Sequence, residues 1–137
     1  MRDTTPKPIL DMLRGVPLFS ACTSSELRSI ANLGTQITVA DGTQLTKEGR
    51  PGMEFFLVLG GEARCSVGGE PVRTMGPGEF FGEMSLLDRQ PRSATVVASG
   101  ETTVLAFDAS EFDGLRKSST SIDRKVRDAA VERDRAR

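Results

Sequence analysis

The feature that most constrains the fold is a repeated rhythm of short apolar runs and turn residues between Leu33 and Phe107. Alternating apolar and polar residues place successive side chains on opposite faces of a strand, and the glycine-rich spacers between runs turn the chain. Many short strands at this spacing are typical of a β-sandwich or a jelly-roll barrel. We expect strands at residues 37–39, 45–47, 54–59, 63–67, 72–75, 93–98 and 102–107.

The spacers predict how these strands connect. Asp41-Gly42 is a strong signal for a hairpin that pairs 37–39 with 45–47. Gly60-Gly61, Gly68-Gly69 and Ser99-Gly100 each predict a turn between the two strands that they separate.

Helical patterns flank the strand-rich interval. Ile9 to Arg14 predicts one short helix. Thr23 and Glu26 have the spacing of a capping box, and a helix that begins there ends at Gly34. Two helices are expected after the strands, at 110–117 and from 119 to about 137. On the second, Ile122, Val126, Ala129 and Ala130 form a narrow apolar stripe. A surface helix on the core is the leading interpretation, and a lid over a ligand or a partner-binding helix are the alternatives.

The expected architecture is therefore mainly β with flanking helices, a double-stranded β-helix or jelly-roll barrel with N-terminal helices and C-terminal lid helices. Its 137 residues suit one domain. We divide it into a helical segment at 1–34, a barrel at 35–108 and C-terminal helices at 109–137.

Composition excludes several classes of function. The net charge is −1, which offers no basic surface for nucleic acid. The chain has no histidine, which removes the usual general base and the commonest metal ligand, so an enzyme would have to work with carboxylates, lysine or a cofactor. With the other features of the sequence taken together, we expect no enzyme, no metal and no cofactor. Cys22 and Cys65 lack metal-site spacing and are interpreted as reduced, small buried residues. No signal peptide precedes the domain, and the longest apolar run, 55–59, is too short for a membrane segment, so we expect a cytoplasmic location.

One interval interrupts the strand rhythm and carries the candidate chemistry. Residues 82–87 suit one short helical turn, whose first amides favour an anion. Arg92 follows, where the chain returns to a strand, and an arginine there suits one phosphate. Glu83 can accept hydrogen bonds from ribose hydroxyls, and Ser93 adds a hydroxyl donor. Taken singly, such residues are usually a surface charge, a carboxylate that compensates a helix dipole, or a turn.

Residues 81–96 read Phe-Gly-Glu-Met-Ser-Leu-Leu-Asp-Arg-Gln-Pro-Arg-Ser-Ala-Thr-Val. This segment closely resembles the phosphate-binding cassette of the cyclic nucleotide-binding domain family, F-G-E-[LM]-[AS]-L-L-x-x-x-P-R-[AST]-A-T-V. The resemblance extends to Val16-Pro17-Leu18-Phe19, to Thr23 with Glu26-Leu27, and to the glycines at 42, 49, 52, 60 and 61.

The resemblance implies a role for each cassette residue. Arg92 is similar to the arginine that pairs with the cyclic phosphate, and Glu83 to the carboxylate that binds the ribose 2′-hydroxyl. Backbone groups of Gly82, Met84 and Ser85 would face ribose and phosphate. On the other side, the ligand would meet Ser93 and Ala94.

The resemblance also implies a regulatory function. The expected ligand is cAMP, with cGMP as the alternative, because members selective for cGMP often have threonine where Ser93 stands, and serine occurs there in bacterial cAMP receptors. The C-terminal helices would move to signal binding to an unknown effector protein or domain, and a residue such as Val126, Ala129 or Ala130 would cover the base. A homodimer is an open alternative.

Competing functions are kept open. One is a degenerate domain that serves as an interaction scaffold without binding nucleotide, and another is a cupin-like metalloenzyme, which the absence of histidine disfavours. No helix-turn-helix follows the last helix, so we expect no DNA-binding segment.

Overall fold

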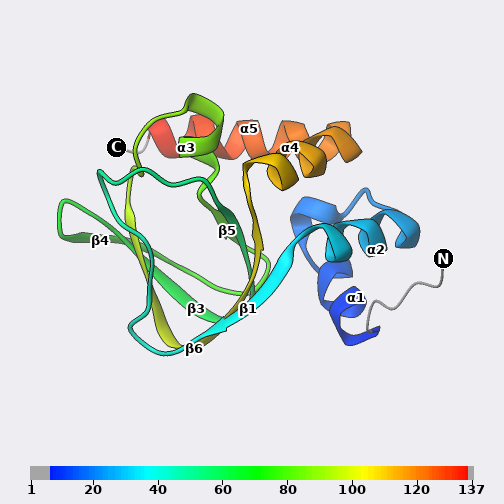
Figure 1. Cartoon of the computed structure of the whole chain (residues 1–137), viewed down its shortest axis with the longest axis horizontal. Coiled ribbons are helices and arrows are strands. Elements are labelled where there is room, and N and C mark those ends of the chain that lie inside the picture. The colour runs from blue at the N-terminus through cyan, green and yellow to red at the C-terminus, as the bar shows by residue number, and fades with distance from the viewer. Residues whose placement is uncertain (1–6, 136–137) are drawn as a thin grey trace.

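The computed structural model describes residues 7–135, and the side chains of residues 9–134. Figure 1 shows α1 and α2 beside the sheet, and α4 and α5 running across one end of it. The helices are α1 (Lys7–Arg14), the 3-10 turn η1 (Pro17–Phe19), α2 (Ser24–Leu33), α3 (Glu83–Asp88), α4 (Ala109–Ser118) and α5 (Thr120–Arg135). The strands are β1 (Thr35–Val39), β2 (Gln44–Thr46), β3 (Phe55–Val67), β4 (Glu70–Met75), β5 (Phe80–Phe81) and β6 (Thr95–Phe107).

Two long antiparallel strands, β3 and β6, organise the sheet. The strand order is β1-β6-β3-β4, with β2 paired to β6 and β5 paired to β3. The pairing of β3 with β6 shifts register around Gly60 and Glu62, and these bulges bend both strands, which lets one sheet curl around an interior. The antiparallel sheet with N- and C-terminal helices is the architecture expected from the sequence.

Of the four predicted turns, three do not connect strands as expected: Gly60-Gly61, Ser99-Gly100 and Asp41-Gly42. Gly60-Gly61 and Ser99-Gly100 are not turns between strands, because each lies inside one 13-residue strand. The positive φ of Gly61 (83°) and Gly100 (76°) allows a kink without ending the strand. The predicted turn at Gly68-Gly69 is confirmed, since Val67 pairs directly with Glu70.

Asp41-Gly42 does not close the predicted hairpin, because β1 and β2 each pair with β6 instead of with each other. The turn is held against β6 by its own polar groups. The Gly42 amide donates to the Ala98 carbonyl at 2.8 Å, and the Asp41 carboxylate accepts from the Gly100 amide at 2.6 Å.

The first part of β3, Phe55 to Leu59, is buried on both faces and so joins two cores. Phe55, Leu57 and Leu59 face the helices and pack in a cluster with Phe107 and Phe112. Phe56 and Val58 face the interior of the curled sheet, where they pack in a second cluster. An alternating strand with both faces apolar thereby connects the helical layer to the interior of the sheet.

The helices begin and end where side chains cap them. The predicted capping box of Thr23 and Glu26 is confirmed at α2, and Asp108 with Glu111 forms a second one at α4. The apolar stripe of α5 packs against the core, as expected for a surface helix, and its residues Ile122 and Val126 are fully buried there. Among the described residues, no helix has the length and apolar content needed to span a membrane.

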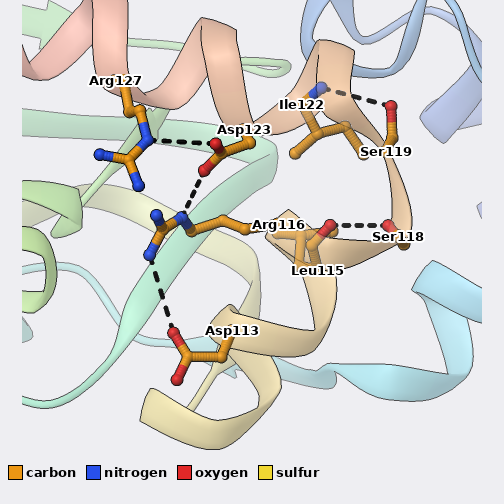
Figure 2. Close-up of polar contacts among 8 residues, drawn as sticks. All are labelled: Asp113, Leu115, Arg116, Ser118, Ser119, Ile122, Asp123 and Arg127. Atoms are coloured by element: carbon orange, nitrogen blue, oxygen red, sulfur yellow. Dashed lines mark hydrogen bonds and ion pairs between the residues drawn. The ribbon is translucent and has the colours of Figure 1, made fainter.

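The corner between α4 and α5 is held by charged side chains (Figure 2). Arg116 Nε donates to Asp123 at 2.6 Å, and Arg127 Nε donates to the other oxygen of that carboxylate at 3.1 Å. Arg116 also lies 3.7 Å from Asp113. Further along α5, Lys125 Nζ donates to the Pro17 carbonyl and the Ser20 hydroxyl, both at 2.8 Å. Polar contacts therefore fasten the first half of α5 to α4 and η1, beside the packing of its buried apolar residues.

Asp123 should make the stability of this corner depend on pH. Hydrogen bonds from Arg116 and Arg127 lower the pKa of its carboxyl, so its contribution is present above the ordinary carboxyl pKa and is lost as the pH falls through the folded value. Asp123→Asn should lower the free energy of unfolding by about 0.5–1 kcal/mol at pH 7, and this difference from wild type should shrink below about pH 4. Urea unfolding across pH measures it, with the exposed Asp128→Asn as control; a difference independent of pH would contradict the assignment.

Candidate functional site

A cavity of about 180 Å³ opens where α3, the strands and the end of α5 meet. In Figure 1, α3 lies beside the C-terminal part of α5, at the end of the sheet away from α1. All seven residues singled out from the sequence line this cavity. The lining residues are Thr46, Cys65, Val67, Val72, Arg73, Phe81, Gly82, Glu83, Met84, Ser85, Arg92, Ser93, Ala94, Val96 and Arg133.

Gly82 turns the chain from β5 into α3. It is the N-cap of α3, with a φ of 94° that side-chain-bearing residues rarely adopt. A Cβ at Gly82 would also lie 2.6 Å from the Glu54 carbonyl oxygen. The short helix predicted at 82–87 is therefore present, as Glu83–Asp88, and it depends on this glycine.

Arg92 is buried, with 6% of its surface exposed, and its hydrogen bonds all go to neutral acceptors. Nη1 donates to the Ser85 hydroxyl at 2.8 Å and to the Gly82 carbonyl at 3.2 Å, and Nη2 donates to the Glu54 carbonyl at 2.8 Å. Burial lowers the pKa of Arg92, and the carboxylates of Glu54 and Glu83 partly oppose this. The guanidinium nevertheless stays charged.

Burial of Arg92 also depends on Gly52. A Cβ at Gly52 would lie 1.9 Å from Arg92 Nε, so the guanidinium occupies space that any other residue would fill. The arrangement holds a positive charge at the cavity wall without a carboxylate directly against it in the described part of the chain. An anion in the cavity would therefore gain strongly from Arg92.

Glu83 is the most deeply buried charge of the site, with 1% exposed. Its carboxylate forms an ion pair with Arg133, which comes from α5. Arg133 also donates from Nη2 to the Phe80 carbonyl at 2.6 Å, and its guanidinium carbon lies 5.0 Å from the centre of the Phe80 ring. A buried carboxylate requires such a partner, because an unpaired one is costly to desolvate. The contact ties α5 to the cassette.

The remaining cassette residues position their neighbours. The Ser85 hydroxyl accepts from Arg92 and faces the Gly82 and Gly52 carbonyls at 3.3 and 3.4 Å. The Ser93 hydroxyl lies 3.6 Å from the Met84 sulfur, a weak acceptor that leaves this hydroxyl able to turn toward another partner.

The cavity includes charged residues that sequence reasoning missed. Arg133 lies seven residues after Val126, so helical periodicity is a signal that could have placed it on the same face of α5, although it was counted among the charged residues outside the apolar stripe. Three residues of α5 were alternatives expected to cover a base, but Val126 is fully buried in the helical core, and Ala129 and Ala130 are also not among the residues that line the cavity. Arg73 of β4 had no signal, because its position depends on how β4 pairs with β3. With Arg73, Arg92 and Arg133 against Glu83, the lining is positive overall.

Comparisons with known proteins identify the family of this chain. A family model described as "Cyclic nucleotide-binding domain" matches residues 36–119. The chain is 36% identical over 124 residues to a cAMP-dependent protein kinase regulatory subunit of Pyricularia oryzae, covering 89% of this chain and 32% of that protein. It is 34% identical over 122 residues to a cyclic nucleotide-gated potassium channel of Rhizobium etli, covering 89% and 34%. The chain thus spans about a third of the length of these curated relatives.

Solved structures show the same fold. The structure titled "cAMP bound PfPKA-R (141-441)" superposes with a TM-score of 0.79 at 28% identity, covering 89% of this chain and 44% of that one. The catabolite activator protein of Thermus thermophilus superposes with a TM-score of 0.71 at 30% identity, covering 86% and 62%. From the matched family model, the relatives and the fold, this chain belongs to the cyclic nucleotide-binding domain family.

Proposed function

We propose that this domain is a cyclic nucleotide sensor that binds cAMP in the cavity beside α3 and signals through α4 and α5. The observation that carries the proposal is the buried Arg92, whose charge faces only neutral acceptors at the cavity wall. The relatives that are cAMP-dependent protein kinase regulatory subunits, and the similar structure with cAMP bound, support this ligand. The domain acts in this proposal as a binding module and not as an enzyme.

The cyclic phosphate is the group best matched to Arg92. A cyclic phosphate carries one negative charge, and a guanidinium donates charge-assisted hydrogen bonds to it. Ser85 and Gly82 hold the guanidinium in place before a ligand arrives, so little conformational entropy is lost on binding.

Glu83 is the acceptor for the ribose hydroxyl. In the structure this carboxylate is paired with Arg133, so ribose and Arg133 compete for it. A ligand that replaces Arg133 at Glu83 releases the end of α5, and binding is thereby coupled to the position of that helix. The free energy of this coupling cannot exceed the difference in ligand-binding free energy between the two positions of α5.

The output is assigned to a partner that contacts α5. The chain covers about a third of its curated relatives, which have further segments beyond the part that matches. An effector protein, a further domain or a second copy of this chain would sense the change at α5. Binding of cAMP to wild type distinguishes this proposal from the scaffold alternative, in which no nucleotide binds.

Arg92→Ala should lower the affinity for cAMP at least about tenfold, because it leaves the phosphate without its charge-assisted hydrogen bonds. Isothermal titration calorimetry measures the affinity, and Arg64→Ala, at an exposed position of β3 outside the cavity, is the matched control. Wild type should also gain thermal stability in millimolar cAMP. The absence of that gain would favour the scaffold.

Gly52→Ala should weaken cAMP binding by about tenfold although it substitutes no residue of the cassette. The added methyl group displaces the Arg92 side chain from its hydrogen bonds. Gly60→Ala is the control, since a Cβ there meets nothing within 4 Å. The same titration compares the two variants. Equal affinities would show that Arg92 need not lie where the structure has it.

Arg133→Ala should tighten cAMP binding by about threefold to tenfold, because it removes the competitor for Glu83, and it should destabilise the ligand-free protein. Titration and thermal unfolding measure both effects, with Arg124→Ala, exposed on the same helix, as control. Weaker cAMP binding by the variant would instead mean that Arg133 contacts the ligand.

A further inference from the structure

Strand β1 forms an exposed edge of the sheet. In the described part of the chain it pairs with β6 alone, and the strand order ends there. Residues 35–38 are exposed, and Val39 is half-buried. Alternate residues of an antiparallel strand direct their N–H and C=O groups to opposite sides, so half of these groups on β1 face away from β6. β1 therefore presents a template for one more strand.

The composition of β1 favours such an added strand. Natural edge strands carry charges, prolines or bulges that prevent further pairing. The strand at the other end of the sheet, β4, contains Glu70, Pro71 and Arg73. β1 reads Thr-Gln-Ile-Thr-Val, without a charge, proline or glycine. Because threonine, isoleucine and valine favour strands, nothing in this segment blocks pairing with another chain.

A row of apolar side chains crosses the sheet and ends at this edge. Val58 of β3 pairs with Val104 of β6, and Val104 pairs with Ile37 of β1. Directly opposed residues share a face of the sheet. Val58 and Val104 are fully buried, whereas Ile37, the last member of the row, is 40% exposed. A further strand with an apolar residue opposite Ile37 would continue the row and remove this side chain from water.

We propose that β1 is a homodimer interface, at which two copies of this chain pair their β1 strands antiparallel about a two-fold axis at Ile37. A second copy is the occupant that fits, because the strand is complementary to itself. The axis pairs Ile37 with the partner's Ile37, Gln36 with the partner's Thr38, and Thr35 with the partner's Val39. None of these pairs contains a charge, and the apolar residue that the row requires lies on the axis.

The surroundings of the edge also permit this pairing. The same axis would place Asp41 opposite the partner's Leu33, so no carboxylate meets another. Figure 1 shows β1 at the end of the sheet away from α3 and α5, so both cavities of the dimer stay open. The assembly closes with two copies, because each has then used its β1 edge. The contact buries little area, so the dimer is weak, with a Kd on the order of 0.1 mM.

Sedimentation velocity over protein concentrations from about 10 µM to about 1 mM should show this dimer and measure its Kd. Ile37→Lys and Ile37→Glu should each raise the Kd at least about tenfold, because the axis brings two like charges together. An equimolar mixture of the two variants should recover the dimer, since the introduced lysine then lies opposite the introduced glutamate. Val131→Lys, at an exposed position of α5, is the matched control and should leave the Kd unchanged.

Hydrogen exchange of wild type is a second measurement that requires no variant. The amides of residues 35–39 should exchange more slowly at about 1 mM protein than at about 10 µM. cAMP should leave the Kd of the dimer unchanged, so the inference does not depend on the proposed function. A wild type that stays monomeric at about 1 mM would overturn the inference, and so would a mixture of the two Ile37 variants that stays monomeric. A dimer that is weakened by Val131→Lys and not by Ile37→Lys would place the contact on α5 and overturn it as well.

Discussion

The rest of the site depends on the burial of Arg92. Desolvating a guanidinium is expensive unless every donor finds an acceptor, and here the acceptors come from separate segments of the chain. Glu54 precedes β3, Gly82 precedes α3, and Ser85 lies on α3. One side chain therefore fastens the cassette to the edge of the long strand. The missing side chain at Gly52 provides the space.

The connection between the site and the rest of the molecule passes through α5. Ile122 and Val126 anchor the first half of this helix in the core, whereas Arg133 reaches Glu83 from its last turn. Asp123 and Lys125 fix the start of α5 to α4 and η1. A change at Glu83 would therefore act on the less anchored end of a helix whose other end is held, which is what the proposed coupling of ligand binding to α5 requires.

The cassette was predictable because its information is local. Gly82, Glu83 and Arg92 lie within eleven consecutive positions, and a short helix started by a glycine follows from sequence spacing alone. The capping box at Thr23 and the turn at Gly68-Gly69 were predictable for the same reason. The hairpin at Asp41-Gly42 was not, because the partner of each strand is chosen by long-range pairing.

By itself, the sequence determined the family, the strand-rich body between helices, and the seven cassette residues that share one cavity. Only the tertiary structure placed Arg133 on Glu83 and Arg73 on the strand wall. Arg133 and Arg73 lie 50 and 10 positions from Glu83 in the chain, and their places depend on the angle of α5 and on the register of β4 with β3. Packing and strand pairing set that angle and register, because local propensity carries no information about which distant surfaces meet.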